Sequence, residues 1–203
     1  MESGQSHVTI AACTDIHADV RFMRKFEKLV NENNPDVVVC CGDLTIFEQH
    51  LSRVLKWISG LHKNVLVIHG NHETEDMMNK LCKNYGVRFL HGKSVCINGV
   101  TFCGWGGGGF SMIDREFDRA FSKISFSSQT VLVTHAPPHG TTLDNLGRNW
   151  GYVGNKSLTA FVKSHSAIRL VLCGHIHENF GKHDKIGTTA ILNPGPAGKI
   201  IKL

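Results

Sequence analysis

Acidic, amide and histidine side chains occur in short clusters that directly follow apolar runs of the sequence. The clusters contain eight residues of interest: Asp15, His17, Asp43, Asn71, His72, His135, His175 and His177. They offer oxygen and imidazole donors but no thiolate, a set that suits borderline divalent metals such as Mn, Fe, Co, Ni or Zn. So many donors exceed what one open catalytic site takes, and they predict two metal ions with a shared ligand.

The spacing of the first clusters indicates how they come together. Asp15, Asp43 and Asn71 follow one another at intervals of 28 positions, close to the roughly 30 residues of a strand–helix–strand unit. The carboxyl ends of such parallel strands meet at the sheet edge where ligands bind. In Asp15-Ile16-His17 and His175-Ile176-His177, alternate side chains point to the same side of an extended segment. We therefore expect one joint site.

Taken singly, each of these residues has an ordinary structural explanation. An aspartate after a strand is often only a helix cap or a turn residue. A lone histidine is more often a surface or satisfied residue than a ligand, and His69, inside an apolar run, fits a core position. The surface interpretation applies to His7, His50, His62, His91, His165 and His183. Five clusters in matching positions favour the metal site over these separate explanations.

Apolar periodicity predicts the elements that position the clusters. In the first half, apolar strand-like runs alternate with segments of helical spacing. The strands are expected at 8–13, 37–41 and 65–68, and the helices at 21–33, 50–61 and 74–85. This alternation predicts an α/β fold with a largely parallel sheet.

The second half of the chain shows a different order of elements. Runs at 94–97 and 100–103 flank Asn98-Gly99, a strong hairpin signal. The remaining expected strands are 131–134, 170–173, 188–192 and 198–203, and the helices are 115–124 and 156–164. No linker interrupts the pattern, so residues 1–203 are expected to form a single domain.

Composition restricts the class of protein. The formal net charge of +5 is spread without a dense basic stripe, which favours a small anionic ligand over dedicated nucleic-acid binding. No apolar run is long enough for a membrane span, and the polar residues 1–7 lack a signal-peptide pattern. The seven cysteines, without a C-x-x-C pair, fit a reducing compartment and argue against a thiolate zinc site. We expect a cytoplasmic protein.

Five motifs together resemble the calcineurin-like metallophosphoesterase superfamily. They stand in the order of that family and span most of the chain: Asp15-x-His17, Gly42-Asp43, Gly70-Asn71-His72-Glu73, His135 and Gly174-His175-x-His177. The short chain is similar to the compact bacterial and archaeal phosphodiesterases of the superfamily. The resemblance implies a four-layer α/β/β/α sandwich of two mixed sheets.

The same resemblance implies a role for each matching residue. Three residues would bind the first metal and three the second, Asp43 would bridge both, and His72 would be the catalytic acid rather than a ligand. The first set is Asp15, His17 and His177, and the second is Asn71, His135 and His175. Mn is the metal we expect first, with Fe, Ni, Co and Zn as alternatives. The implied activity is hydrolysis of a phosphate ester by a hydroxide held between the two ions.

One departure from the family pattern concerns the second motif. In the phosphoprotein phosphatases this motif continues with a second Asp, which orients the catalytic His, and an Arg, which holds phosphate. Here Ile46 and Phe47 stand instead, which argues against that branch and leaves open what orients His72. Glu73 is a candidate only for outer-shell support.

The substrate is expected to be a small phosphate ester, with nucleotide-like esters among the candidates. A phosphodiesterase is the first hypothesis, and a phosphomonoesterase or a catalytically silent binding module of the same fold are the alternatives. The glycine-rich segment 104–110 could line the cleft with Trp105 or Phe110, or be a surface loop. The loop 137–152 begins beside a ligand, so His139 and Arg148 are candidate substrate residues.

Overall fold

The computed structural model describes residues 7–122, 124 and 129–203 of the chain. Its α-helices are α1 (Val20–Asn33), α2 (Leu51–Ser59), α3 (Glu75–Tyr85), α4 (Arg115–Phe121) and α5 (Lys156–Ser164). Its strands are β1 (Thr9–Cys13), β2 (Val37–Cys40), β3 (Val65–Val67), β4 (Arg88–Phe89), β5 (Lys93–Ile97), β6 (Val100–Trp105), β7 (Thr130–Thr134), β8 (Ile168–Leu172), β9 (His183–Ile186), β10 (Thr189–Leu192) and β11 (Lys199–Lys202). A 3-10 turn, η1 (His177–Asn179), follows β8.

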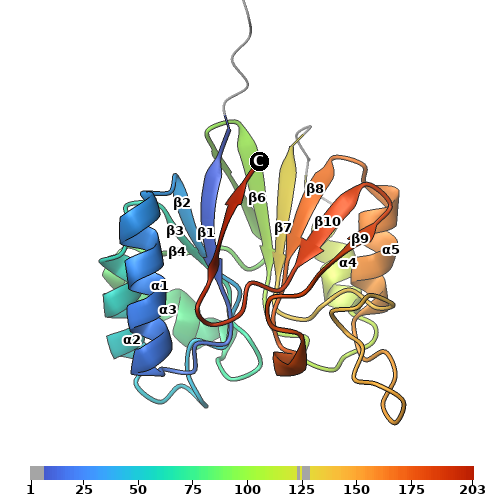
Figure 1. Cartoon of the computed structure of the whole chain (residues 1–203), viewed down its shortest axis with the longest axis horizontal. Coiled ribbons are helices and arrows are strands. Elements are labelled where there is room, and N and C mark those ends of the chain that lie inside the picture. The colour runs from blue at the N-terminus through green and yellow to red at the C-terminus, as the bar shows by residue number, and fades with distance from the viewer. Residues whose placement is uncertain (1–6, 123, 125–128) are drawn as a thin grey trace, which may run out of the picture.

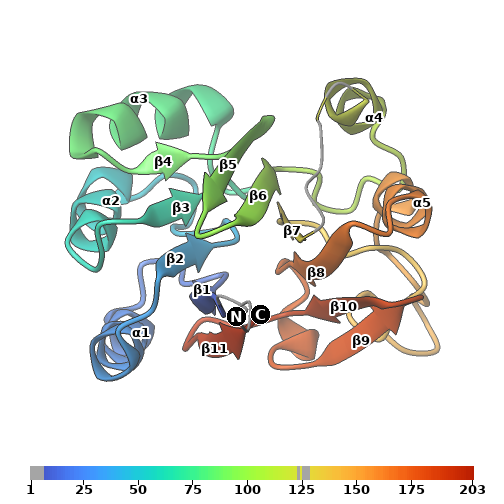
Figure 2. The same ribbon diagram turned by 90° about the horizontal axis from the view of Figure 1, so that it is seen from above.

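The strands form two mixed sheets that pack face to face. The first has the order β11-β1-β2-β3-β4 and the second β5-β6-β7-β8-β10-β9. In the first sheet β11 is antiparallel to β1 and the other pairs are parallel. Helices α1, α2 and α3 cover one outer face, and α4 and α5 cover the other (Figures 1 and 2). The predicted four-layer α/β/β/α sandwich is confirmed.

The β-branched runs explain why both faces of each sheet are buried. In β2, Val37 and Val39 face the second sheet, whereas Val38 and Cys40 face the helices. In β6, Phe102 faces the first sheet and Cys103 packs with α4 and α5. Strands buried on both faces read as continuous apolar runs rather than as alternating ones, which is the pattern of this sequence.

The structure differs from the sequence-based prediction in a few elements. Two short strands, β4 and β9, were not expected, because two residues at Arg88–Phe89 and the polar run HDKI carry little strand signal. Helix α4 ends at Phe121, and the remainder of the predicted helix includes residue 123, which lies outside the described residues. The hairpin at Asn98-Gly99 is confirmed. No helix in the described part of the chain could cross a bilayer.

Candidate metal centre

The ends of five strands bring the predicted cluster residues together. Strands β1, β2 and β3 are parallel neighbours, and so are β7 and β8. Their carboxyl ends therefore open in the same direction, at the lower edge in Figure 1. The predicted ligands, each after its strand, are Asp15 and His17 (β1), Asp43 (β2), Asn71 (β3), His135 (β7), and His175 and His177 (β8).

Asp15, His17 and His177 form the first ligand group. The Oδ1 atom of Asp15 lies 3.3 Å from Nε2 of His177 and 3.9 Å from Nε2 of His17. The two Nε2 atoms are 3.2 Å apart. The Nδ1 of His17 lies 3.0 Å from the carbonyl oxygen of Thr45. Because a carbonyl only accepts, Nδ1 carries the proton and Nε2 is free to bind a cation.

Asp43, His135 and His175 form the second ligand group. One ligand atom of each lies within 4.8 Å of the other two, as in the first group. Nε2 of His135 is 3.3 Å from Oδ2 of Asp43 and 3.0 Å from Oδ1 of Asn71. The amide oxygen of Asn71 therefore faces the same space as this second group.

Asp43 lies between the two groups. A third set, His17, Asp43 and His72, meets the same 4.8 Å criterion, and it joins a member of the first group to a member of the second. The Oδ1 atom of Asp43 accepts the backbone N–H of His72 at 3.0 Å, while Oδ2 faces His135. This is the position that a ligand shared by two ions requires.

Glycines before three of the clusters allow the loops to meet. A Cβ atom on Gly42 would collide with the backbone of Gly70, one on Gly70 with the carboxylate of Asp43, and one on Gly174 with the hydroxyl of Thr14. Each glycine thus belongs to the close approach of two strand ends, not to the metal ligation itself. This explains why glycine stands beside the ligands in the sequence.

The acidic and imidazole side chains of the site pair with one another. Burial opposes protonation of His135, but the hydrogen bond and charge of Asp43 raise its pKa to about 9. Burial likewise opposes ionisation of Asp43, and the hydrogen bond and charge of His135 lower its pKa to about 2. For Asp15, burial is outweighed by the imidazole of His177 beside Oδ1, by the charge of His135 and by the hydrogen bond from Thr14, so its pKa is lowered.

Within the described part of the chain, two buried atoms of the ligand groups form no hydrogen bond. They are Oδ1 of Asp15, which has the ion-pair contact with His177, and Nε2 of His175, one in each ligand group. Burial, together with the charge of His135, lowers the pKa of His175 to about 4, so its ring is neutral near pH 7 and one of its nitrogens offers a lone pair. A buried polar atom without a hydrogen bond is costly, and a cation bound at each group would satisfy its atom. The residues present therefore fit divalent metal.

His72 lies at the mouth of the centre. Its Nε2 is 3.9 Å from Oδ2 of Asp43, and its ring packs edge-on to His17 at 5.1 Å between centroids. The side chain of Phe47 is 72 % exposed, and its ring centroid lies 4.6 Å from that of His72. Phe47 therefore restricts the rotation of the His72 ring on its solvent-facing side. This contact was not expected from the sequence.

Glu73 has a role that the sequence did not reveal. Its carboxylate accepts the backbone N–H groups of Asp43 (3.1 Å), Gly70 (3.0 Å) and Thr45 (2.8 Å) and the Thr45 hydroxyl (3.0 Å). It joins the loops after β2 and β3, which carry Asp43 and Asn71. Its carboxylate thus binds backbone N–H groups of these loops and is not the support for His72 that the sequence suggests. A carboxyl three residues after Gly70 is the only sequence signal for this cap.

The candidate substrate residue Trp105 faces away from the centre. Its indole Nε1 donates to Asp114 at 2.8 Å, and its ring packs on His91 and Phe117. Alternation along β6 accounts for this, because Cys103 and Trp105 point to the α4 and α5 side. From the same glycine-rich segment, Phe110 instead contacts His175, with 4.4 Å between ring centroids.

The other two candidate substrate residues lie on the loop after β7. Arg148 is exposed near the tip of this loop. Nδ1 of His139 lies 3.5 Å from a carboxylate oxygen of the buried Asp144. Neither residue is among those that line the hollow over the ligands, which are Asp43, Asn71, His72, Phe110, Leu146, His175, Ile176, His177 and Glu178.

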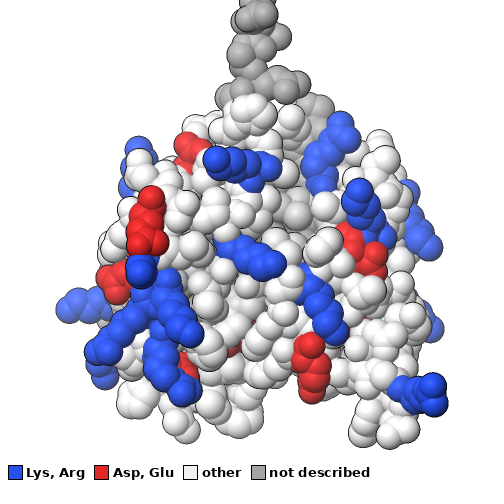
Figure 3. Space-filling view, viewed as in Figure 1, with Lys and Arg blue, Asp and Glu red and all other residues white. Residues whose placement is uncertain are grey.

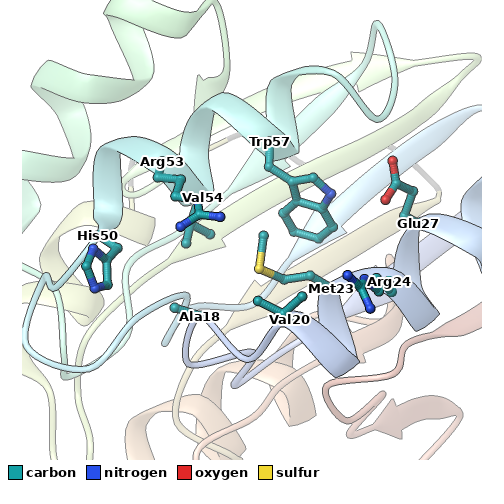
Figure 4. A pocket seen from close by; sticks show the side chains of 9 residues that line it. All are labelled: Ala18, Val20, Met23, Arg24, Glu27, His50, Arg53, Val54 and Trp57. Atoms are coloured by element: carbon teal, nitrogen blue, oxygen red, sulfur yellow. The ribbon is translucent and has the colours of Figure 1, made fainter.

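A separate hollow of about 230 Å³ lies between α1 and α2 (Figure 4). Arg24, Glu27 and Arg53 carry its charge, and Met23 and Trp57 provide apolar walls. Lys and Arg side chains gather over this side of the molecule and are scattered elsewhere on the face in Figure 3. None of the predicted ligands lines this hollow, so the convergent chemistry lies at the strand ends.

Comparison with known proteins agrees with this geometry. The chain is 28% identical to an uncharacterized protein of Methanocaldococcus jannaschii, over 94% of this chain and 89% of that one. Its fold is similar to that of the TT1561 protein of Thermus thermophilus, with a TM-score of 0.74 and 15% identity over 96% and 97% of the two chains. It is also similar to an archaeal phosphodiesterase, with a TM-score of 0.56 and 18% identity over 92% and 83%.

The family model for calcineurin-like phosphoesterases matches residues 8–179. That segment includes each of the ligand clusters described above. The chain belongs to the calcineurin-like phosphoesterase family.

Proposed function

We propose that this protein is a phosphodiesterase that hydrolyses a small phosphodiester at a centre of two divalent metal ions. The observation that carries the proposal is the position of Asp43 between two ligand groups, each with a buried atom that forms no hydrogen bond. When bound, two such ions would supply an activated water and hold the phosphate oxygens. Similarity to an archaeal phosphodiesterase supports the diester as substrate.

The side chains of the chain itself would position the ester and supply a proton. The first group, with Asp15, His17 and His177, and the second, with Asn71, His135 and His175, would each hold one ion. Of the two ring nitrogens of His72, Nε2 is the one that faces the ligands, and it lies 3.9 Å from Oδ2 of Asp43. His72 would donate its proton from this atom to the departing alcohol oxygen, and Phe47 would keep the ring aimed inward.

The first test compares two chromogenic esters. Protein loaded with Mn²⁺ is assayed with bis-p-nitrophenyl phosphate and with p-nitrophenyl phosphate, and a chelator is the control for metal dependence. We expect faster metal-dependent turnover of the diester. Faster turnover of the monoester would favour a phosphomonoesterase, and no turnover of either would favour a silent binding module.

The second test separates the acid role of His72 from a ligand role. His72→Ala should retain both ions, counted by elemental analysis, and lose about 100-fold or more in kcat. His183→Ala, an exposed histidine on β9, is the matched control and should behave as wild type. Loss of an ion from His72→Ala would show that the third set, His17, Asp43 and His72, binds metal.

A further inference from the structure

A third hollow, of about 790 Å³, adjoins the hollow over the ligands of the candidate metal centre. It is lined by Phe110, Met112, Leu146, Trp150, Tyr152, Val153 and Glu178. Three of these residues, Phe110, Leu146 and Glu178, also line the hollow over the ligands. A group attached to a phosphate at the metal centre would therefore extend directly into this apolar hollow.

One wall of the hollow is a narrow hairpin, residues 144–153, which we call the tongue. The N–H of Val153 donates to the carbonyl of Asp144 at 3.0 Å, and Asn145 pairs with Tyr152. Nearer the tip, the N–H of Leu146 donates to the carbonyl of Gly151 at 2.9 Å. The paired backbone holds Leu146, Trp150 and Tyr152 on one short element.

The base of the tongue is fixed by a buried carboxylate. Asp144 has an exposed fraction of 0%. Its oxygens accept the backbone N–H groups of Gly140, Thr141 and Gly154 at 3.0, 2.7 and 2.9 Å. Hydrogen bonds of this kind to a charged acceptor are among the stronger ones in proteins, so the tongue is held in place without a ligand.

The opposite wall, with Phe110 and Met112, is tied to the chain that follows the tongue. The N–H of Lys156 donates to the carbonyl of Met112 at 2.7 Å. The side-chain amide of Asn155 donates to the carbonyl of Ser111 at 2.9 Å. The two walls of the hollow are therefore connected, and the space between them is formed in advance.

The lining leaves large apolar side chains in water. Trp150 is 76% exposed, Phe110 62% and Tyr152 49%. Contiguous exposed apolar surface of this kind marks binding sites. Three of the seven lining side chains are aromatic, which favours a flat ring, because rings gain from stacked or edge-on contacts beyond their buried area. Glu178, the only charged lining residue, disfavours a second anionic group.

We propose that this hollow is a subsite for a neutral aromatic group of the substrate, such as a nucleobase or an aryl ring. Trp150 and Tyr152 of the tongue are then the specificity-determining residues. This inference rests on the proposed function, because the phosphate at the metal centre fixes where the ring begins. It narrows the substrate from any small phosphodiester to one that carries an aromatic group.

The test uses phosphonates, which present the anionic group but are not hydrolysed. Methyl-, cyclohexyl- and phenylphosphonate are titrated by calorimetry into the full chain loaded with Mn²⁺. We expect phenylphosphonate to bind roughly tenfold more tightly than methylphosphonate, with cyclohexylphosphonate between them. Quenching of tryptophan emission by phenylphosphonate, lost in Trp150→Phe while affinity persists, would place the ring beside Trp150.

Substitutions in the tongue test whether its aromatic side chains contribute to the binding of the ring. Trp150→Ala and Tyr152→Ala should each reduce the phenyl-to-methyl ratio to within about threefold and leave methylphosphonate affinity unchanged. Ile113→Ala is the matched control, because Ile113 is 65% exposed on the loop of Phe110 but does not line the hollow. It should retain the full ratio. Thermal unfolding of each variant verifies that it is folded.

The possible outcomes separate this inference from the proposed function. Equal binding of phenyl- and methylphosphonate overturns the subsite even if esters are hydrolysed. Tighter binding of the cyclohexyl ligand overturns the aromatic preference. A phenyl preference that depends on Trp150, in a protein that hydrolyses no ester, supports the subsite and overturns the proposed function. Binding of none of the three ligands overturns both.

Discussion

Replacement of Glu73 by glutamine should weaken the connection between the loops that carry Asp43 and Asn71. In the native chain one carboxylate oxygen, Oε2, accepts the N–H groups of Asp43 and Gly70, and Oε1 accepts the N–H and hydroxyl of Thr45. Glutamine has one acceptor oxygen. If that oxygen takes the Oε2 position, the new NH₂ group takes the Oε1 position. It can donate to the Thr45 hydroxyl, but it cannot accept the Thr45 N–H, because both groups are donors.

The size of the effect follows from these contacts. One buried backbone N–H loses its partner, which costs about 1–3 kcal/mol, and two more N–H groups exchange a charged acceptor for a weaker neutral one. Removal of the charge offsets part of this, because burial and the nearby Asp43 raise the pKa of Glu73 and so oppose its ionised form. We expect a net loss of about 2–4 kcal/mol in the free energy of unfolding.

Urea unfolding of the metal-free protein measures this loss without a contribution from bound ions. Glu32→Gln is the matched control, since the Glu32 side chain is 59% exposed and, among the described residues, forms an ion pair only with Lys28 across one helical turn. Its effect should stay below about 0.5 kcal/mol. If Glu73→Gln unfolds with the free energy of wild type, the carboxylate does not join the two loops and this reasoning is wrong.

The other predictions concern protons, the tongue and Phe47. Both ring nitrogens of His135 face oxygen acceptors, so metal binding at pH 7 should release its proton, and the affinity for metal should rise up to about pH 9. Calorimetry in two buffers that shows no proton release would contradict this. The raised pKa also means that His135 stabilises the metal-free fold below its unfolded pKa, about 6.5, and loses this contribution through about pH 9; a urea midpoint that does not fall over this range would refute it. Asp144→Ala leaves three backbone N–H groups without their acceptor and should cost about 2–4 kcal/mol by urea unfolding, whereas the exposed Arg148→Ala should not. Phe47→Ala should lower kcat severalfold with both ions retained and unfolding changed by less than about 1 kcal/mol; an unchanged kcat would remove Phe47 from the positioning of His72.

The sequence predicted the sheets well, because its apolar runs are long and β-branched and the ligands follow them directly. Asp15, Asp43 and Asn71 could be placed at one edge because parallel neighbouring strands repeat at a regular interval. The direction of Trp105 could have been derived from alternation with Phe102, which faces the other sheet. The hydrogen bonds of Glu73 could not be predicted from the sequence. They depend on the turn at Gly70, which brings the carboxylate next to the loop after β2.

The tongue was also beyond prediction from the sequence. Its backbone pairing consists of a few hydrogen bonds around a single bridge between Asn145 and Tyr152, and such short pairing leaves no period in the sequence. Asp144 looks like any loop acid until its partners Gly140, Thr141 and Gly154 are known. The adjoining hollow depends on two loops that are more than thirty positions apart, and no local pattern reports their approach.

The pairing of β11 with β1 has a consequence for the order in which the molecule folds. Thr9 is in register with Lys202, and Val8 and Leu203 exchange hydrogen bonds of 3.1 and 3.0 Å. Closing a loop of this length is entropically costly and slows folding. Until β11 docks, β1 has an unpaired edge that other chains can contact. Strand β1 leads directly to Asp15 and His17. Removal of β11 should therefore promote aggregation through that edge, so the segment that carries Asp15 and His17 depends on a strand that lies far along the chain.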